Sequence, residues 1–258
     1  MPLKHILITV AFSMTFWANV GLAQGWYLSA NVGYGFGAGT QTIGYNTTNS
    51  GTTSSSEGVY GSFGEGFKFG ASAGYMATRN LGTDLGFSYW LGKTFDMTDN
   101  STGVLTTKAS GSGFVAVPSI VLSADMNTID PYARLGLVFA IVKVTQEMNY
   151  SYTGQTYDKT VEESGNLAFG FAGAFGILVP SSGTVGFFAE VTLCSVTYSP
   201  SQTETTKYTV NGVDQLSTIT PKVVEYKSSN SSSDQNTALS VRRPFSFLGI
   251  NAGVRINL

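Results

Sequence analysis

The sequence predicts an all-β fold: an eight-stranded antiparallel up-and-down transmembrane β-barrel. Three observations predict it. Apolar and small or polar residues alternate in eight separate segments, the connections between these segments are short and long in turn, and an export signal precedes them. No uninterrupted apolar run near 18 residues follows the signal, so a spanning chain has to close a barrel, because lipid offers backbone groups no hydrogen-bond partners.

The composition agrees with strands that face lipid. Charged residues make up 12% of the 258 residues, whereas Gly, Tyr and Phe occur 31, 13 and 17 times. That charged share is about half of what soluble proteins carry. The formal net charge is −2, and removal of Lys4 with the export signal leaves 13 basic and 16 acidic residues, or −3. Neither value favours nucleic acid as a partner.

The first 23 residues predict a cleaved signal peptide. Lys4 and His5 precede an apolar stretch at 6–20, and small residues at Gly21 and Ala23 fit a signal-peptidase site. A membrane anchor is the alternative, but about 15 residues with polar ones among them are too few to span a bilayer. We expect 24–258 to form the barrel domain, exported to an oxidising compartment in which the single cysteine, Cys194, has no internal partner.

The first three predicted strands alternate regularly. Each predicted strand has one apolar face and one face of small or polar residues, the pattern of a sheet between lipid and a crowded lumen. Residues 26–36 place Trp26 and Tyr34 on the apolar face, residues 67–75 place Phe67 and Tyr75 there, and residues 84–91 place Tyr89 there.

The fourth strand, 112–124, alternates less regularly than the others. We expect Phe114 and Ile120 to face outward, although Val115, Val117 and Val121 lie on the opposite face. The alternation returns in the last four strands, which are predicted at 132–141, 167–179, 187–194 and 247–258.

The connections predict which end of the barrel faces outward. The segments 78–82, 125–129 and 181–184 are short, whereas 38–62, 93–111, 145–165 and 199–243 are long and rich in Ser, Thr and Asn. Short periplasmic turns and long extracellular loops are typical of outer-membrane barrels. If the first strand runs outward, the aromatic residues form two girdles. Trp26, Tyr75 and Phe187 lie near the periplasmic end, and Tyr34 and Tyr89 are among those near the extracellular end.

A soluble β-barrel or sandwich is the alternative fold. Such proteins normally carry water-facing residues outside and apolar residues inside. The predicted polarity here is the reverse, which favours the bacterial outer membrane as the location.

The chain resembles the OmpA/OmpX-like outer-membrane β-barrel proteins along its whole exported length. The resemblance is carried by Pro131-Tyr132-Ala133-Arg134-Leu135-Gly136-Leu137, by Phe187-Phe188-Ala189-Glu190-Val191 and by the last eight residues. It implies that Asn251, Gly253, Ile256 and Leu258 form the signal read by the barrel-assembly machinery. Such signals commonly end in an aromatic residue, and Leu258 departs from that while keeping the required alternation.

Residues with catalytic potential are scarce. The sole histidine, His5, lies in the predicted signal peptide, so the exported chain has no imidazole base or ligand. The glycines around Gly35 alternate with aromatic residues within one strand and do not form a nucleotide-binding turn. Asp96, Asp99 and Asn100 lack calcium-loop spacing. We therefore expect no enzymatic activity, no cofactor and no metal.

Inward-facing charges predict a network inside the barrel. An eight-stranded barrel is only wide enough for its interior side chains to meet, and buried charges need partners. Glu190 and Arg255 lie on neighbouring strands and are the first expected pair. Independent, water-solvated lumen residues are the alternative. The expected members share the small or polar parity of their strands: Lys68, Asp84, Arg134, Glu190 and Arg255.

The long loops are the candidate sites for partners. The loop 199–243 contains Asn211-Gly212 between β-forming residues, which predicts a hairpin at 207–213. Arg242 and Arg243 are candidates for contacting lipopolysaccharide phosphates. The expected role is a structural envelope protein that sits in outer-membrane lipid and displays loops to an extracellular ligand or protein. A small pore or conduit for small or apolar solutes is the alternative.

Overall fold

The computed structural model describes residues 25–50, 53–126, 128–181, 184–229 and 234–258. The predicted signal peptide, 1–23, lies outside the described residues. Among the described residues there is no helix with the length and apolar character needed to cross a membrane.

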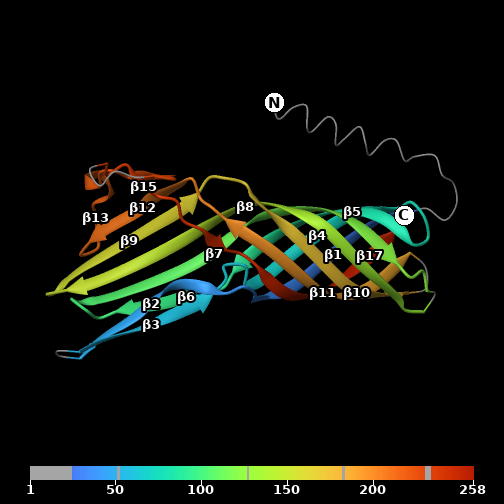
Figure 1. Cartoon of the computed structure of the whole chain (residues 1–258), viewed down its shortest axis with the longest axis horizontal. Helices are drawn as coiled ribbons and strands as arrows, with labels where there is room; N and C mark the ends of the chain where they lie inside the picture. The colour runs from blue at the N-terminus through green and yellow to red at the C-terminus, as the bar shows by residue number, and fades with distance from the viewer. Residues whose placement is uncertain (1–24, 51–52, 127, 182–183, 230–233) are drawn as a thin grey trace.

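Eight long strands close into an antiparallel barrel (Figure 1). Each strand pairs with the next, and the last pairs back with the first, β1 with β17. The predicted eight-stranded barrel, which is also the fold that the family resemblance implies, is therefore confirmed. The barrel strands in order are β1 (Gly25–Gly37), β4 (Gly66–Met76), β5 (Leu81–Gly92), β7 (Val104–Ser123), β8 (Asp130–Tyr152), β10 (Ala168–Pro180), β11 (Val185–Tyr198) and β17 (Phe247–Asn257).

The segments predicted as long loops contain much regular structure. They all leave the same end of the barrel, and we call the structure that they form the cap. Its elements are β2 (Gln41–Ser50), β3 (Thr53–Gly61), β6 (Phe95–Asp99), β9 (Gln155–Ser164), β12 (Gln202–Val210), β13 (Val213–Asp214), the short 3-10 helix η1 (Leu216–Thr218), β14 (Val223–Lys227), β15 (Thr237–Leu239) and β16 (Arg243–Pro244). The expectation of loops here was too coarse, because these Ser- and Thr-rich strands lack the apolar alternation that marks the barrel strands.

Two barrel strands run on into the cap. β7 and β8 stay paired from the barrel out to Val104 and Ser151, and β9 pairs with the outer part of β8. β12 pairs with β9, so β7, β8, β9 and β12 project side by side beyond the barrel (Figure 1). The predicted hairpin at 207–213 is confirmed: Val210 pairs with Val213 around Asn211 and Gly212, whose φ angles of 51° and 80° suit a tight hairpin turn.

The faces of the strands follow the predicted alternation. In β7 the predicted outward and inward faces are confirmed, since Phe114 is 69% exposed outside while Val115 and Val121 are 2% and 3% exposed inside. Aromatic rings on the outside of the barrel also pair across strands. Trp26 pairs with Tyr75 at the short-turn end, and Tyr34 pairs with Phe67 nearer the cap. The outside of the barrel is thus apolar and the inside carries the charges.

Candidate functional site

The centre of the lumen is an ion network around Arg134 of β8. Its guanidinium binds Glu190 of β11 through two hydrogen bonds of 2.5 and 2.6 Å, and Asp84 of β5 at 3.4 Å. Both carboxylate side chains are 1% exposed. Because the two carboxylates come from opposite sides of Arg134 in the strand order, the network ties distant strands together across the lumen.

Neutral side chains complete the hydrogen bonding of Glu190. Tyr132 donates its hydroxyl to Glu190 at 2.8 Å, and the Asn251 amide donates to it at 3.0 Å. A buried carboxylate is tolerated when its remaining lone pairs are satisfied in this way.

Asp84 is satisfied by two hydroxyl groups. Tyr27 donates to it at 2.9 Å and Ser72 at 2.7 Å. These neutral partners of the two carboxylates were not predicted from the sequence. The available signal was that Tyr132, Asn251 and Ser72 all lie on the inward-facing side of their strands.

The expected Glu190–Arg255 pair was wrong. Asn251 lies directly opposite Glu190, whereas Arg255 lies opposite Gly186, four residues further along β17. At about 3.3 Å per residue the separation is about 13 Å, too far for a salt bridge. Arg255 instead stacks its guanidinium over the ring of Tyr27, 3.7 Å from the ring centroid.

Lys68 is inside the barrel but is not part of the network. Its ammonium donates to the backbone carbonyls of Gly64 at 2.7 Å and Gly66 at 3.3 Å, and it lies 3.8 Å from the ring centroid of Phe247. It makes no salt bridge within the described part of the chain. Carbonyl dipoles and an aromatic face replace the carboxylate that the sequence analysis expected.

Two cavities flank the ion network. The larger one, about 110 Å³, lies on the cap side and is lined by Lys68, Trp90 and Phe247 among others. The smaller one, about 30 Å³, lies on the short-turn side and is lined by Tyr27 and Arg255 among others. Asp84 and Arg134 line both cavities, so the salt bridge is the wall that separates them.

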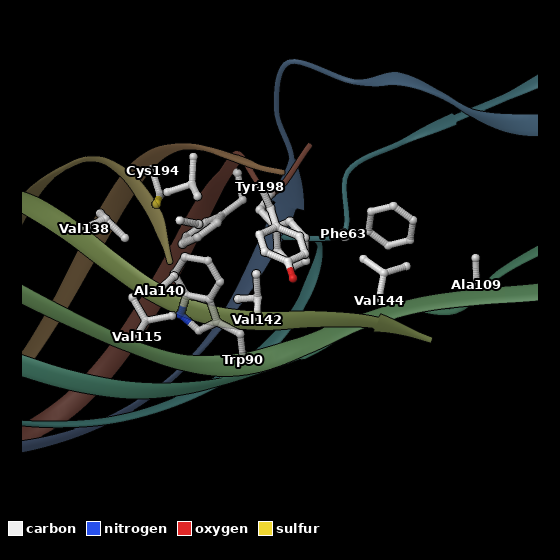
Figure 2. Packing of buried hydrophobic residues seen from close by; sticks show 14 of the residues in the cluster. Phe63, Trp90, Ala109, Val115, Val138, Ala140, Val142, Val144, Cys194 and Tyr198 are labelled. Atoms are coloured by element: carbon white, nitrogen blue, oxygen red, sulfur yellow. The ribbon is translucent and has the colours of Figure 1, made fainter. Parts of the chain in front are cut away.

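A hydrophobic plug fills the barrel where it meets the cap. Phe63 and Phe245 pack with ring centroids 5.8 Å apart, and Tyr198 meets Phe245 edge to face at 5.9 Å. Figure 2 shows Tyr198 and Phe63 lying over Val142 and Val144 of β8. These side chains are almost completely buried, so they close the lumen above the larger cavity.

A buried carboxylate in the cap, Glu163 of β9, joins four strands. Arg243 of β16 donates to it through two nitrogen atoms, Tyr226 of β14 donates at 3.3 Å and Gln146 of β8 at 3.1 Å. Burial raises the pKa of Tyr226 to about 12, and the negative charge of Glu163 acts in the same direction. Burial lowers the pKa of Arg243, but the hydrogen bond to Glu163 and the negative charge of Glu163 act against it, and the net shift of the pKa is upward.

The two adjacent arginines have different surroundings. Arg243 is held by Glu163, so its guanidinium is not free for a lipopolysaccharide phosphate as the sequence analysis expected. Arg242 is exposed beside it. Arg242 lies just before β16 and points to solvent, whereas Arg243, the first residue of β16, points into the cap toward Glu163.

The four residues of the expected assembly signal lie on or just after β17. Asn251 points into the lumen, and Gly253 lies against the ring of Phe188, where an added Cβ would stand 2.6 Å from Cζ. Ile256 and Leu258 are exposed on the outside. The predicted parity of this segment is therefore present in the structure, while its recognition by an assembly machinery stays a prediction.

The lumen leaves little room for a side chain at Gly33, and this gives a first prediction. An added Cβ at Gly33 would lie 2.7 Å from the carbonyl oxygen of Ile250 and would collide with the side chain of Asn251, which holds Glu190. We expect Gly33→Ala to lower the free energy of unfolding in urea by roughly 1–3 kcal/mol. Gly86→Ala is the matched control, because the nearest atom to its Cβ is 3.8 Å away. Equal losses in the two variants would contradict this packing.

The barrel geometry can be compared with known proteins. Neisserial surface protein A (NspA) aligns over 92% of this chain and 100% of its own, with 14% identity and a TM-score of 0.39. The outer membrane protease OmpT from Escherichia coli aligns over 94% of this chain and 100% of its own, with 7% identity and a TM-score of 0.30. No protein-family model and no curated protein matches the sequence. Similarity this low assigns no function.

Within the described residues, no group of three or more His, Cys, Asp or Glu side chains is arranged to hold a metal ion. The carboxylates that do meet inside the lumen, Asp84 and Glu190, share one guanidinium between them. The Asp84–Arg134–Glu190 network therefore cross-links the strands of the barrel wall.

Proposed function

We propose that this protein is a non-enzymatic integral barrel of the bacterial outer membrane, with a lumen filled by side chains and a structural role in the envelope. The observation that carries the proposal is the polarity of the closed barrel. Large apolar side chains cover its outside, whereas the buried charges of Asp84, Arg134 and Glu190 lie inside. Contact with lipid accounts for the apolar outside, and charges that neutralise one another account for the buried ionic groups inside.

The arrangement of exposed aromatic rings supports a bilayer around the barrel. Pairs such as Trp26–Tyr75 and Tyr89–Phe114 lie near the two ends of the apolar band, where rings with a polar atom suit the interface between lipid and water. Between them the outward positions are occupied by residues such as Leu135 and Phe171, which are 68% and 66% exposed.

The layered interior supports a barrel that does not conduct ions. Along the lumen the plug at Phe63 and Phe245 comes first, then the larger cavity, then the Arg134 salt bridge and the smaller cavity. An ion would have to displace both an apolar plug and a satisfied salt bridge.

The chemistry of the interior supports a role without catalysis. Both lumen carboxylates accept hydrogen bonds from a guanidinium and neutral donors, so they are poorly placed to exchange protons with a substrate. The sole histidine, His5, belongs to the predicted signal peptide. The strands of the cap are then available to an extracellular partner, and the exposed Arg242 is available to lipopolysaccharide.

A conductance measurement tests this function. We expect the purified protein in a planar bilayer to show no steady conducting state, while a general porin reconstituted in parallel conducts. Separate fractionation of cell envelopes should place the protein with the outer membrane. A large, stable, ion-conducting state would contradict the filled lumen and support the alternative of a small pore.

A further inference from the structure

The part of the sheet that projects beyond the barrel has two different faces. The face that continues the lumen side of β8 carries four tyrosines, whereas the opposite face is polar. We call the first one the tyrosine face. It consists of ten residues on β7, β8, β9 and β12, which the strand register places side by side: Leu105, Thr107, Met148, Tyr150, Tyr152, Gln155, Tyr157, Lys159, Tyr208 and Val210.

The rings of the tyrosine face form a platform at the far end of the sheet. Tyr150 and Tyr152 are parallel to within 9°, with centroids 6.2 Å apart, and Tyr157 on β9 lies 6.0 Å from Tyr150. Tyr152 is 50% exposed. Within the described part of the chain, the hydroxyls of Tyr150 and Tyr152 donate to no other group, while that of Tyr157 binds Gln155. The platform therefore offers both ring faces and hydrogen-bonding groups to solvent.

The opposite face of the same strands needs no ligand. Asn149 and Thr209 both donate to Asp158, so three strands are joined there by hydrogen bonds of the protein itself. Lys108 and Glu147 lie opposite each other on the same side. The polar groups of the opposite face are thus paired with one another, whereas the tyrosine face presents rings and hydroxyls to solvent. The tyrosine face is therefore the one suited to binding a ligand.

We propose that the tyrosine face binds a neutral oligosaccharide. A sugar ring has an apolar C–H face that stacks on an aromatic ring, and hydroxyls at its edge that pair with tyrosine hydroxyls and amides. This inference deepens the proposed function by naming the class of ligand that the displayed sheet takes, and it rests on that function only for access to the ligand.

Size and charge favour an oligosaccharide over other occupants. A standard protein–protein interface uses about 20–30 residues on each side, which is two to three times the ten residues of the tyrosine face. A polyanion needs a basic cluster, but Lys159 is the only charged residue among the ten, and Asp99 on the adjacent strand β6 carries the opposite charge. A short uncharged ligand with flat apolar faces matches both properties.

Calorimetric titration of the folded protein tests the proposal. The probes are cellohexaose, chitohexaose and maltohexaose, and the detergent is an amine oxide, because glucoside and maltoside head groups are themselves sugars. We expect saturable binding of at least one probe. Tyr152→Ala should weaken it about tenfold through the loss of stacking. Tyr152→Phe should retain most of it, because the ring remains.

The matched control is Tyr45→Ala on β2, which removes a tyrosine that is 62% exposed, compared with 50% for Tyr152, from another part of the cap and should leave binding unchanged. Absence of binding to all three probes at millimolar concentration would overturn the proposal. So would binding of dextran sulfate alone, or equal losses in the Tyr45 and Tyr152 variants. A protein that fractionates outside the outer membrane would contradict the proposed function while leaving this titration intact, so the two failures are distinguishable.

Discussion

Replacing Arg134 with alanine is expected to lower the free energy of unfolding of the barrel by roughly 3–5 kcal/mol. The change leaves Glu190 and Asp84 buried without the guanidinium that both of them bind. Uncompensated charge in a low-dielectric interior is costly, and the neutral donors on these carboxylates offset only part of it. Urea unfolding of the folded protein in lipid vesicles, followed by tryptophan fluorescence, measures the loss.

Two further variants separate the charge effect from the loss of side-chain volume. Lys143→Ala removes one partner of the exposed pair with Glu162 and should cost less than about 1 kcal/mol. The triple variant Arg134→Met, Asp84→Asn, Glu190→Gln removes all three charges together and should recover most of the stability lost in Arg134→Ala. If Arg134→Ala costs no more than Lys143→Ala, the lumen charges are solvated independently by water and do not act as a network.

Replacing Glu163 with alanine is expected to release the last long connection from the barrel. Arg243 would become a buried, unpaired cation, and Tyr226 and Gln146 would lose their acceptor. The free energy of local opening of this connection should fall by roughly 3 kcal/mol, which corresponds to an open population about a hundredfold larger. Trypsin cleavage after Lys222 and Lys227, followed by mass spectrometry, measures that population.

The neighbouring carboxylate provides the control. Glu162 points to the other side of β9 and pairs with Lys143 at 3.0 Å, where both side chains are substantially exposed. Glu162→Ala should change the cleavage rate only slightly. The barrel strands should remain resistant to trypsin in both variants. Equal acceleration in the two variants, or cleavage within the barrel, would show that Glu163 does not hold this connection.

Sequence alone predicted the strands of the barrel because period-two alternation is a local property. The eight segments, the short turns between them and the outward face of each strand all depend on which residues are apolar and which are small, as at Phe114 and Val115 in β7. The turn at Asn211-Gly212 was equally local, since only certain residues adopt its backbone angles without strain.

The cap was predicted less well, because its strands are polar or half-exposed on both faces. Glu163 lies in the segment 145–165, which was predicted as a loop, and nothing in its sequence neighbourhood distinguishes it from Glu162. Its burial depends on Arg243, Tyr226 and Gln146, which come from three other strands.

The alternation of residue types was enough to predict an eight-stranded barrel with apolar residues outside and charged residues inside, namely Lys68, Asp84, Arg134, Glu190 and Arg255. Which of these charged groups meet depends on the three-dimensional arrangement of the strands. Parity places a side chain on a face, but the register of neighbouring strands and the tilt across the lumen set its height along the barrel. Glu190 and Arg134 lie at the same height and form a salt bridge, whereas Arg255 lies at the height of Tyr27 and stacks on its ring.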